Sequence, residues 1–253
     1  MFDDELRIAS DAVREAGGEV ARLRREGLRY GRKDGWELVS EADLHAAELL
    51  HDRLLNAFPS DGWLNEEHRD TADRLGCDRT WIVDPIDGTR EYLQGIPEYA
   101  ISVGLSFCGA PVLGVVYNPA TEEFFAARVD GASEKTPSAL WKPRYDVLVG
   151  RGEHSWDELP PLPSGARVHG VGSVAYRLAL LSAGKKGDAV LTGYGRMEWD
   201  VAAGVALCLA AGLRVTDVLG EPLAFNKPSP HIRGLVVAEP GLHNRIVQHI
   251  DQW

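Results

Sequence analysis

Apolar residues recur at helical spacing twice near the start of the chain. The first stripe predicts an amphipathic helix that ends before Gly27, and it is made of Phe2, Leu6, Ala9, Val13, Ala16, Val20 and Leu23. A second helix is predicted from about Ser40 to Pro59, and its apolar stripe is made of Leu44, Ala47, Leu50, Leu54 and Leu55. Because each helix has one apolar face, we expect both to cover a sheet.

Short runs of apolar and β-branched residues follow these helices and predict strands. The expected strands are Thr80–Val83, Ala100–Phe107, Val112–Tyr117 and Glu123–Val129, with the middle two joined at Cys108–Pro111. Because three of them follow one another with short connections, this part of the chain predicts a sheet rich in hairpins.

A boundary between two halves is predicted at Gly131–Pro143, where Ser, Thr, Pro, Gly and Lys are mixed. We place an N-terminal α+β half at residues 1–132 and a C-terminal α/β half at residues 133–253. In the second half, strands are expected at Asp146–Val149, Arg167–Val171, Ala189–Leu191 and Leu235–Ala238, and helices at Ser173–Ala183 and Val201–Ala211. This alternation predicts an α/β fold built as a layered α+β sandwich.

The composition excludes several classes of protein. The 253 residues include 38 acidic and 27 basic side chains, and the net charge of −11 argues against binding to a nucleic acid, which needs a basic face. No apolar run approaches the roughly 18 residues that span a membrane, and the acidic start does not resemble a secretory signal. We therefore expect a cytoplasmic protein without a membrane contact.

The cysteines predict neither disulfides nor a zinc site. Cys77, Cys108 and Cys208 are odd in number, far apart and without a paired spacing. We expect them to be reduced thiols with a structural role.

The segment Trp81–Thr89, with the sequence WIVDPIDGT, places two acids behind a predicted strand. A strand followed by a tight loop can aim Asp84 and Asp87 at one point, since Pro85 stiffens the loop and Gly88 relaxes it. Carboxylates held in this way suit Mg²⁺. A solvated turn explains the same residues, because Asp-Pro and Asp-Gly are common in turns. The segment alone leaves both interpretations open.

Other acids are equally ambiguous when each is considered alone. Glu66 and Glu67 form a pair that is typical of a solvated surface. Asp200 stands at the start of a predicted helix, where an acid caps free amides. Asp43 follows Ser40 at the spacing of a capping box. None of these residues needs a metal to explain it.

The order of the acids along the chain is distinctive. Asp43, the Glu66-Glu67 pair, the DPIDGT run and Trp199-Asp200, followed by VAAG, resemble the lithium-sensitive, Mg²⁺-dependent phosphatases of the inositol monophosphatase superfamily. This superfamily includes fructose-1,6-bisphosphatase and the bisphosphate nucleotidases, and the resemblance extends over nearly the whole chain. It implies the αβαβα fold of inositol monophosphatase and fructose-1,6-bisphosphatase.

The resemblance also implies roles for individual residues. The metal ligands for two or three Mg²⁺ ions would be Glu66, Asp84, Asp87, Asp200 and the backbone carbonyl of Ile86. Asp43, Glu66 and Thr89 would be catalytic and position the attacking water. Glu67 would help to hold these residues in place. The substrate contacts would be Asp87, Gly88, Thr89, Gly172, Ser173, Tyr194, Arg196 and Asp200. Relatives suggest a homodimer that acts on a phosphorylated small molecule.

Two positions depart from the pattern of this superfamily. The second glycine of a pair is replaced at Gly212-Leu213, which we interpret as a variation in packing. Inositol monophosphatases have a glutamate that holds inositol hydroxyls seven residues before the aspartate of the Trp-Asp pair, and here that position is Gly193.

Gly193 and the segment Gly195–Asp200 favour the branch of the bacterial CysQ-type 3′(2′),5′-bisphosphate nucleotidases. The predicted reaction is removal of the 3′-phosphate of adenosine 3′,5′-bisphosphate, in support of sulfate assimilation. Tyr194 would stack on the adenine or pack in the core, and Arg196 would bind the remote phosphate or lie along the surface. An inositol-1-phosphate or fructose-1,6-bisphosphate phosphatase is the alternative enzyme. A non-catalytic module that binds a divalent ion or a nucleotide is the alternative of a different class.

Overall fold

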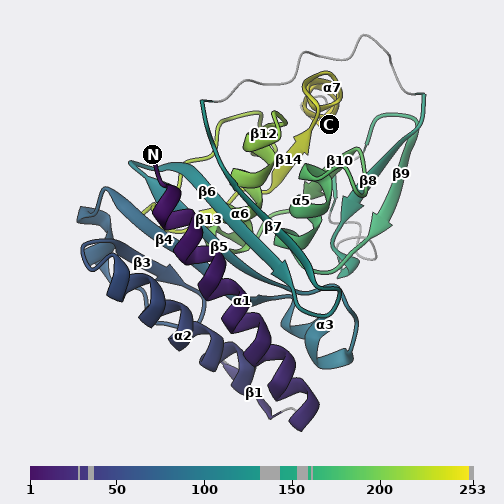
Figure 1. Cartoon of the computed structure of the whole chain (residues 1–253). Coiled ribbons are helices and arrows are strands. Elements are labelled where there is room, and N and C mark those ends of the chain that lie inside the picture. Colours follow the sequence, from purple (N-terminus) through teal and green to yellow (C-terminus); the bar gives the residue numbers. More distant parts are fainter. Residues whose placement is uncertain (28, 34–36, 132–142, 153–158, 161, 251–253) are drawn as a thin grey trace.

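Two five-stranded sheets alternate with three layers of helices (Figure 1). The computed structural model describes residues 1–27, 29–33, 37–131, 143–152, 159–160 and 162–250. Helices α1 and α2 cover the outer face of the first sheet, α5 and α6 lie between the two sheets, and α7 packs on the second sheet. The predicted αβαβα layering is therefore confirmed.

The first two layers come from the N-terminal half of the chain. The helices are α1 (Asp3–Glu26) and α2 (Glu41–Ala57), and the sheet has the order β3 (Gly62–Asn65), β4 (Arg79–Asp87), β5 (Ala100–Phe107), β6 (Ala110–Asn118) and β7 (Glu123–Arg128). Strands β4 to β7 are antiparallel neighbours in chain order, which confirms the predicted hairpins. Strand β3 runs parallel to β4 and was not predicted, because four residues are too few to show a period.

The remaining layers come from the C-terminal half. The second sheet has the order β12 (Arg214–Thr216), β14 (Leu235–Ala238), β10 (Ala189–Thr192), β8 (Tyr145–Val149) and β9 (Ala166–Gly170), and the helices are α5 (Val174–Ser182), α6 (Glu198–Ala210) and α7 (Pro240–Ile250). Strand β8 is parallel to β9 and β10, and β14 is antiparallel to its neighbours. The predicted alternation of strands and helices is confirmed here, although β12 and α7 were not predicted.

Several short elements complete the fold. They are the hairpin β1 (Tyr30–Lys33) and β2 (Glu37–Ser40), the 3₁₀ helix η1 (Ala72–Gly76), helix α3 (Thr89–Gln94), and the ribbon of β11 (Arg196–Met197) and β13 (His231–Ile232). Sequence periodicity did not predict them, because each is too short to show a period.

A single buried cluster joins the two halves of the chain. It contains Ile82 and Val116 from the first sheet, Leu178 and Val205 from the central helices, and Val237 from the second sheet. Each sheet comes from one side of the boundary that we propose at residues 132 and 133. The central helices α5 and α6 come from the C-terminal half and pack against both sheets. Residues 132–142 lie outside the described part of the chain.

Two details of the predicted helices and strands are corrected. Leu44 is 46% exposed and does not belong to the buried stripe of α2; the buried residues of this helix are Ala42, Asp43, Ala46, Ala47, Leu50 and Leu54. The strand predicted at Thr80–Val83 continues as β4 through the DPID motif. The predicted glycine stop of α1 is confirmed, because Gly27 is its C-cap with φ 111°.

The cysteines and the helices each give one further finding. Cys77, Cys108 and Cys208 are all free, although only Cys208 is buried and Cys108 is exposed in a hairpin turn. Among the helices of the described residues, none is both long enough and apolar enough to cross a membrane.

Candidate active site

The DPID motif lies inside strand β4 at an irregularity in its pairing. Asp84 faces Ser102 and Asp87 faces Ala100, so β4 has one more residue between these pairs than its partner. Pro85 has no N–H to donate to the ladder, which explains the irregularity. The Oδ1 atom of Asp84 accepts a hydrogen bond of 3.0 Å from the amide of Ile86, as in a turn, but Asp84 is only 2% exposed, so the alternative of a solvated turn is wrong.

Four carboxylates converge at this irregularity. Glu66 directly follows β3 and its amide donates to the carbonyl of Val83, 3.4 Å away, which places it beside the end of β4. Burial raises the pKa of Asp84 well above its usual value, and the charges of Glu66, Asp87 and Asp200 raise it further. Residues from three distant parts of the chain therefore share one electrostatic environment.

The turn after β3 orients the acidic pair. The Oδ1 atom of Asn65 accepts hydrogen bonds from the amides of Glu67 (2.6 Å) and His68 (2.7 Å). The charge of Glu67 contributes to raising the pKa of Asp43, so Glu67 lies near that carboxylate.

Asp43 caps helix α2 and also contacts the threonine of the DPIDGT run, while its catalytic role stays a prediction. It forms the predicted capping box at the start of α2, since its Oδ2 atom accepts from the amide (2.7 Å) and the hydroxyl (2.5 Å) of Ser40. Its Oδ1 atom lies 3.0 Å from the hydroxyl of Thr89, which is also 3.0 Å from the carbonyl of Ile86. The helix cap thus fixes an acid against the threonine of the DPIDGT run.

We expect Asp43 to make the stability of the metal-free protein depend on pH. Burial raises the pKa of Asp43 to about 6, against the opposing hydrogen bonds from Ser40 and Thr89. Between pH 4 and 6 the folded protein then binds more protons than the unfolded chain, so the free energy of unfolding falls as the pH rises, by up to about 3 kcal/mol. Denaturation in a chelator, compared across this range for the wild type and Asp43→Asn, should show that the free energy of unfolding falls less steeply with pH in the variant. Asp52→Asn, an exposed position on the same helix, is the control, and an equal slope in all three proteins would contradict the prediction.

The start of helix α5 holds the second aspartate of the motif. The Oδ2 atom of Asp87 accepts from the hydroxyl of Ser173 (2.7 Å) and the amide of Ala175 (2.6 Å). The amide of Gly172 donates to the carboxylate of Glu98 (2.7 Å), and the amide of Ser173 donates to the carbonyl of Glu98 (3.0 Å). The predicted helix start at Ser173 is confirmed, but these amides have acceptors within the protein. Contact of Gly172 and Ser173 with substrate stays a prediction.

Two arginines act on the same aspartate, and sequence reasoning missed one of them. Burial raises the pKa of Asp87, while the charges of Arg177 and Arg196 lower it in part. Arg177 is fully buried in α5. It is the one charged residue in the sequence VAYRLALLS, and a lone cation in an apolar helix is a signal that could have identified it.

The ribbon of β11 and β13 presents the other predicted substrate residues. Tyr194 is 74% exposed, so the alternative in which it packs in the core is wrong. Arg196 is half-buried, and its charge reaches Asp87, so it does not simply lie along the surface. One oxygen of Asp200 accepts from the amide of Met197 (2.9 Å), which confirms the capping role of this acid at the start of α6.

Comparison with known proteins decides the family. Residues 3–252 match the sequence model of the inositol monophosphatase family. The chain belongs to this family.

Individual relatives agree with the family match. The chain is 33% identical over 234 residues to an inositol-1-monophosphatase of Rhizobium meliloti (strain 1021), covering 85% of this chain and 86% of that protein. It is 29% identical over 254 residues to a 3′-phosphoadenosine 5′-phosphate phosphatase of Mycobacterium tuberculosis (strain CDC 1551 / Oshkosh), covering 88% and 84%. The crystal structure of the extragenic suppressor protein suhB from Bartonella henselae superposes with a TM-score of 0.81 at 25% identity, covering 99% of both chains.

The family membership establishes the class of chemistry. Members of the inositol monophosphatase family are Mg²⁺-dependent phosphatases, and we conclude that this chain is a phosphatase. The names of the relatives include inositol-1-monophosphatase and 3′-phosphoadenosine 5′-phosphate phosphatase, so the family alone leaves the substrate open.

The residues of the site fit the metal of the family. Among the described residues, no three His, Cys, Asp or Glu side chains already form a metal cage. Mg²⁺ does not need such a cage, because it keeps several waters and binds one or two carboxylates together with substrate phosphate. A cation placed among Asp84, Glu66, Asp87 and Asp200 would relieve the repulsion that raises the pKa of Asp84. The donor set is thus hard and anionic, as Mg²⁺ requires, with Asp84 and Asp87 buried and Glu66 and Asp200 partly buried.

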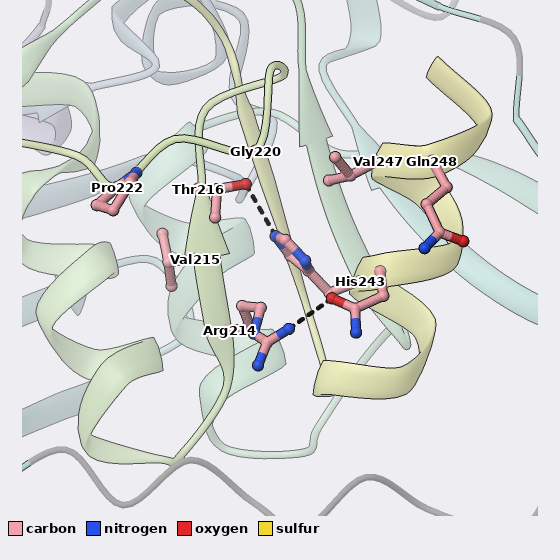
Figure 2. A pocket seen from close by; sticks show the side chains of 9 residues that line it. Arg214, Val215, Thr216, Gly220, Pro222, His243, Val247 and Gln248 are labelled. Carbon is pink, nitrogen blue, oxygen red and sulfur yellow. Dashed lines mark hydrogen bonds between the residues drawn. The ribbon is translucent and has the colours of Figure 1, made fainter. Parts of the chain in front are cut away.

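A separate cavity lies elsewhere in this phosphatase. It has a volume of about 550 Å³ and is formed by β12, the turn that follows it and α7 (Figure 2). Two hydrogen bonds cross it, from Arg214 to Asn244 (2.5 Å) and between Thr216 and His243 (2.9 Å). None of the residues that line it is among those predicted for the site, which centres on the acid cluster of Glu66, Asp84, Asp87 and Asp200.

Proposed function

We propose that this phosphatase removes the 3′-phosphate of adenosine 3′,5′-bisphosphate and forms AMP. In this proposal it acts in the cytoplasm in support of sulfate assimilation, and it works as a homodimer. The observation that carries the choice of substrate is the segment that leads into the ribbon of β11 and β13, where an exposed Tyr194 and a half-buried Arg196 follow Gly193.

The acid cluster would hold the metal ions. The ligands in this proposal are the side chains of Glu66, Asp84, Asp87 and Asp200 with the carbonyl of Ile86, and they would hold two or three ions. When bound, Mg²⁺ lowers the pKa of a water and neutralises the charge on phosphoryl oxygens. Asp87 would be held in place for this role by its hydrogen bonds to Ser173 and to the amide of Ala175.

Asp43 and Thr89 would prepare the attacking water. With Asp43 ionised, the Thr89 hydroxyl donates its only proton to the carboxylate, 3.0 Å away. A lone pair on the threonine oxygen can then accept a hydrogen bond from the water, and Glu66 would orient the same water. The capping box of α2 keeps Asp43 in this position through Ser40.

The ribbon supports a nucleotide in preference to a polyol. Gly193 cannot supply the hydrogen bonds that a glutamate at this position would give to inositol hydroxyls, and lost polar contacts change specificity strongly. The exposed ring of Tyr194 can stack on adenine, and the guanidinium of Arg196 can bind the remote phosphate through two hydrogen bonds.

The test compares substrates with one enzyme preparation. We expect the kcat/KM for adenosine 3′,5′-bisphosphate to exceed the values for inositol 1-phosphate and fructose 1,6-bisphosphate by about tenfold or more.

Arg196→Ala should raise the KM for adenosine 3′,5′-bisphosphate and leave the KM for substrates with a single phosphate unchanged. Arg233→Ala, which removes an exposed arginine next to β13, is the matched control. A preference of the wild type for inositol 1-phosphate would overturn the proposal, and an equal effect of Arg196→Ala on both classes would overturn the role of Arg196.

Hydrolysis of inositol 1-phosphate is the second candidate function. It is favoured by the 33% identity to an inositol-1-monophosphatase, and the same comparison of substrates decides between the two. A non-catalytic module that binds ions or nucleotides is tested by phosphate release in the presence and absence of a chelator.

We expect Li⁺ to inhibit this enzyme and Ca²⁺ to replace Mg²⁺ poorly. Li⁺ can occupy a Mg²⁺ position between carboxylates with only half of the charge, and Ca²⁺ has a larger and looser coordination shell that misplaces the water. Initial rates should be measured during titration with LiCl at constant ionic strength, with NaCl and KCl as controls. Equal effects of the three salts would contradict the prediction for Li⁺.

A further inference from the structure

A buried arginine in the N-terminal half reaches a loop of the C-terminal half. Arg74 lies on η1 and is only 2% exposed. It makes a bidentate ion pair with Asp70, with both N···O distances at 2.7 Å. The guanidinium of Arg74 also donates to the side-chain oxygen of Asn226 (2.7 Å) and to the carbonyl of Lys227 (3.0 Å). The side-chain amide nitrogen of Asn226 in turn donates to the backbone carbonyl of Arg74 (3.0 Å). A cation buried in this way is stable only because each contact compensates for lost water.

A buried glutamate holds the same loop from the other side. Glu198 is fully buried, and its carboxylate accepts from the amides of Asn226 (2.7 Å) and Lys227 (3.1 Å). Asn226 has φ 58°, in the left-handed region that non-glycine residues rarely adopt. The loop is therefore fixed between two buried groups of opposite charge, Arg74 and Glu198.

This contact connects two segments of the active site. Glu198 is the first residue of α6 and stands two residues after Arg196 and two before Asp200. The amide of Glu198 donates to the carbonyl of Pro230 (2.8 Å), just before β13, which pairs with β11. On the other side, Asp70 follows the turn that carries Glu66. The contact thus ties the Glu66 segment of one half to the Arg196 and Asp200 segment of the other.

We propose that Arg74 and Glu198 are positioning residues, which set the place of the β11–β13 ribbon relative to the acid cluster and thereby the affinity for substrate. Neither side chain needs to touch the substrate for this role. The inference rests on the proposed phosphatase site but not on its preferred substrate, because the ribbon flanks the acids whichever phosphomonoester is bound.

The test uses two variants and a matched control. Asn226→Gly keeps the left-handed backbone without strain and removes both side-chain contacts to Arg74. Arg74→Gln removes the charge and the bidentate ion pair. Arg79→Gln is the control, since Arg79 also makes ion pairs within the N-terminal half, with Glu5 and Asp61, but has no contact to the ribbon.

We expect Asn226→Gly and Arg74→Gln to raise the KM by about tenfold with a smaller change in kcat. The reason is that a displaced ribbon weakens the binding of substrate more than it slows the chemical step. The control should lower stability without changing the KM. Hydrogen–deuterium exchange should be measured in the presence of a chelator. Compared with the wild type, backbone amides at residues 194–200 and 226–232 should exchange faster in Asn226→Gly and Arg74→Gln, but not in the control.

The outcomes separate positioning from a merely structural role. An unchanged KM in folded Asn226→Gly overturns the inference, as does the same rise in KM in Arg79→Gln. If Arg74→Gln does not fold, Asn226→Gly alone decides. If the wild type hydrolyses no phosphomonoester, the proposed function fails, whereas unchanged exchange in the ribbon of Asn226→Gly overturns this inference independently.

Discussion

Asp84→Asn is expected to lower kcat/KM by about a thousandfold or more, equivalent to about 4 kcal/mol of transition-state stabilisation, because Asp84 is a metal ligand in the proposed site. The fold should remain intact and the metal-free protein should not lose stability. Burial and the charges of Glu66, Asp87 and Asp200 raise the pKa of Asp84, so its ionised form destabilises the fold at pH values above the pKa of the unfolded chain. A neutral amide of the same shape avoids this cost and can donate to Glu66.

The measurement combines kinetics at saturating Mg²⁺ with denaturation in a chelator. Asp87→Asn should lose activity to a similar extent, and its remaining oxygen can still accept from Ser173 and Ala175. Asp78→Asn, at an exposed position just before β4, is the control and should keep full activity. A kcat/KM near the wild-type value in either variant of the motif would show that the metal assignment is wrong.

Gly114→Ala is expected to lower the free energy of unfolding by about 4 kcal/mol or more, which is exceptional for a single methyl group. Gly114 lies on β6 where the backbone of α6 crosses it. An added Cβ would lie 2.1 Å from the carbonyl oxygen of Ala203 and 2.8 Å from its carbonyl carbon. Because both contacts are to backbone, α6 would have to move off the sheet, and Asp200 at its start would move with it.

Urea denaturation monitored by tryptophan fluorescence measures this effect. Gly18→Ala is the matched control, because Gly18 is exposed in α1 and an added Cβ meets no atom within 4 Å. The control should gain about 0.5–1 kcal/mol from the better helix propensity of alanine. A Gly114→Ala protein as stable as the wild type would contradict the close packing of α6 on the first sheet.

The sequence by itself determined the features that depend on neighbouring residues. The apolar stripe and terminal glycine of α1, the hairpins of the first sheet and the alternation in the second half follow from local periodicity and turn chemistry. The series of acids from Asp43 to Asp200 carried the resemblance to the family, which the match over residues 3–252 confirmed. The capping roles of Asp43 and Asp200 were also readable, since a cap is a local interaction.

Only the tertiary structure decided which polar groups are buried together. The bond of Asp87 to Ser173 and the contacts of Arg74 and Glu198 with Asn226 join residues that are far apart in the chain. Their partners are chosen by how the layers pack, and a buried charge is tolerated only where packing supplies those partners. A sequence pattern records whether a residue is polar, but the energy of a buried polar residue depends on atoms that the fold brings from elsewhere.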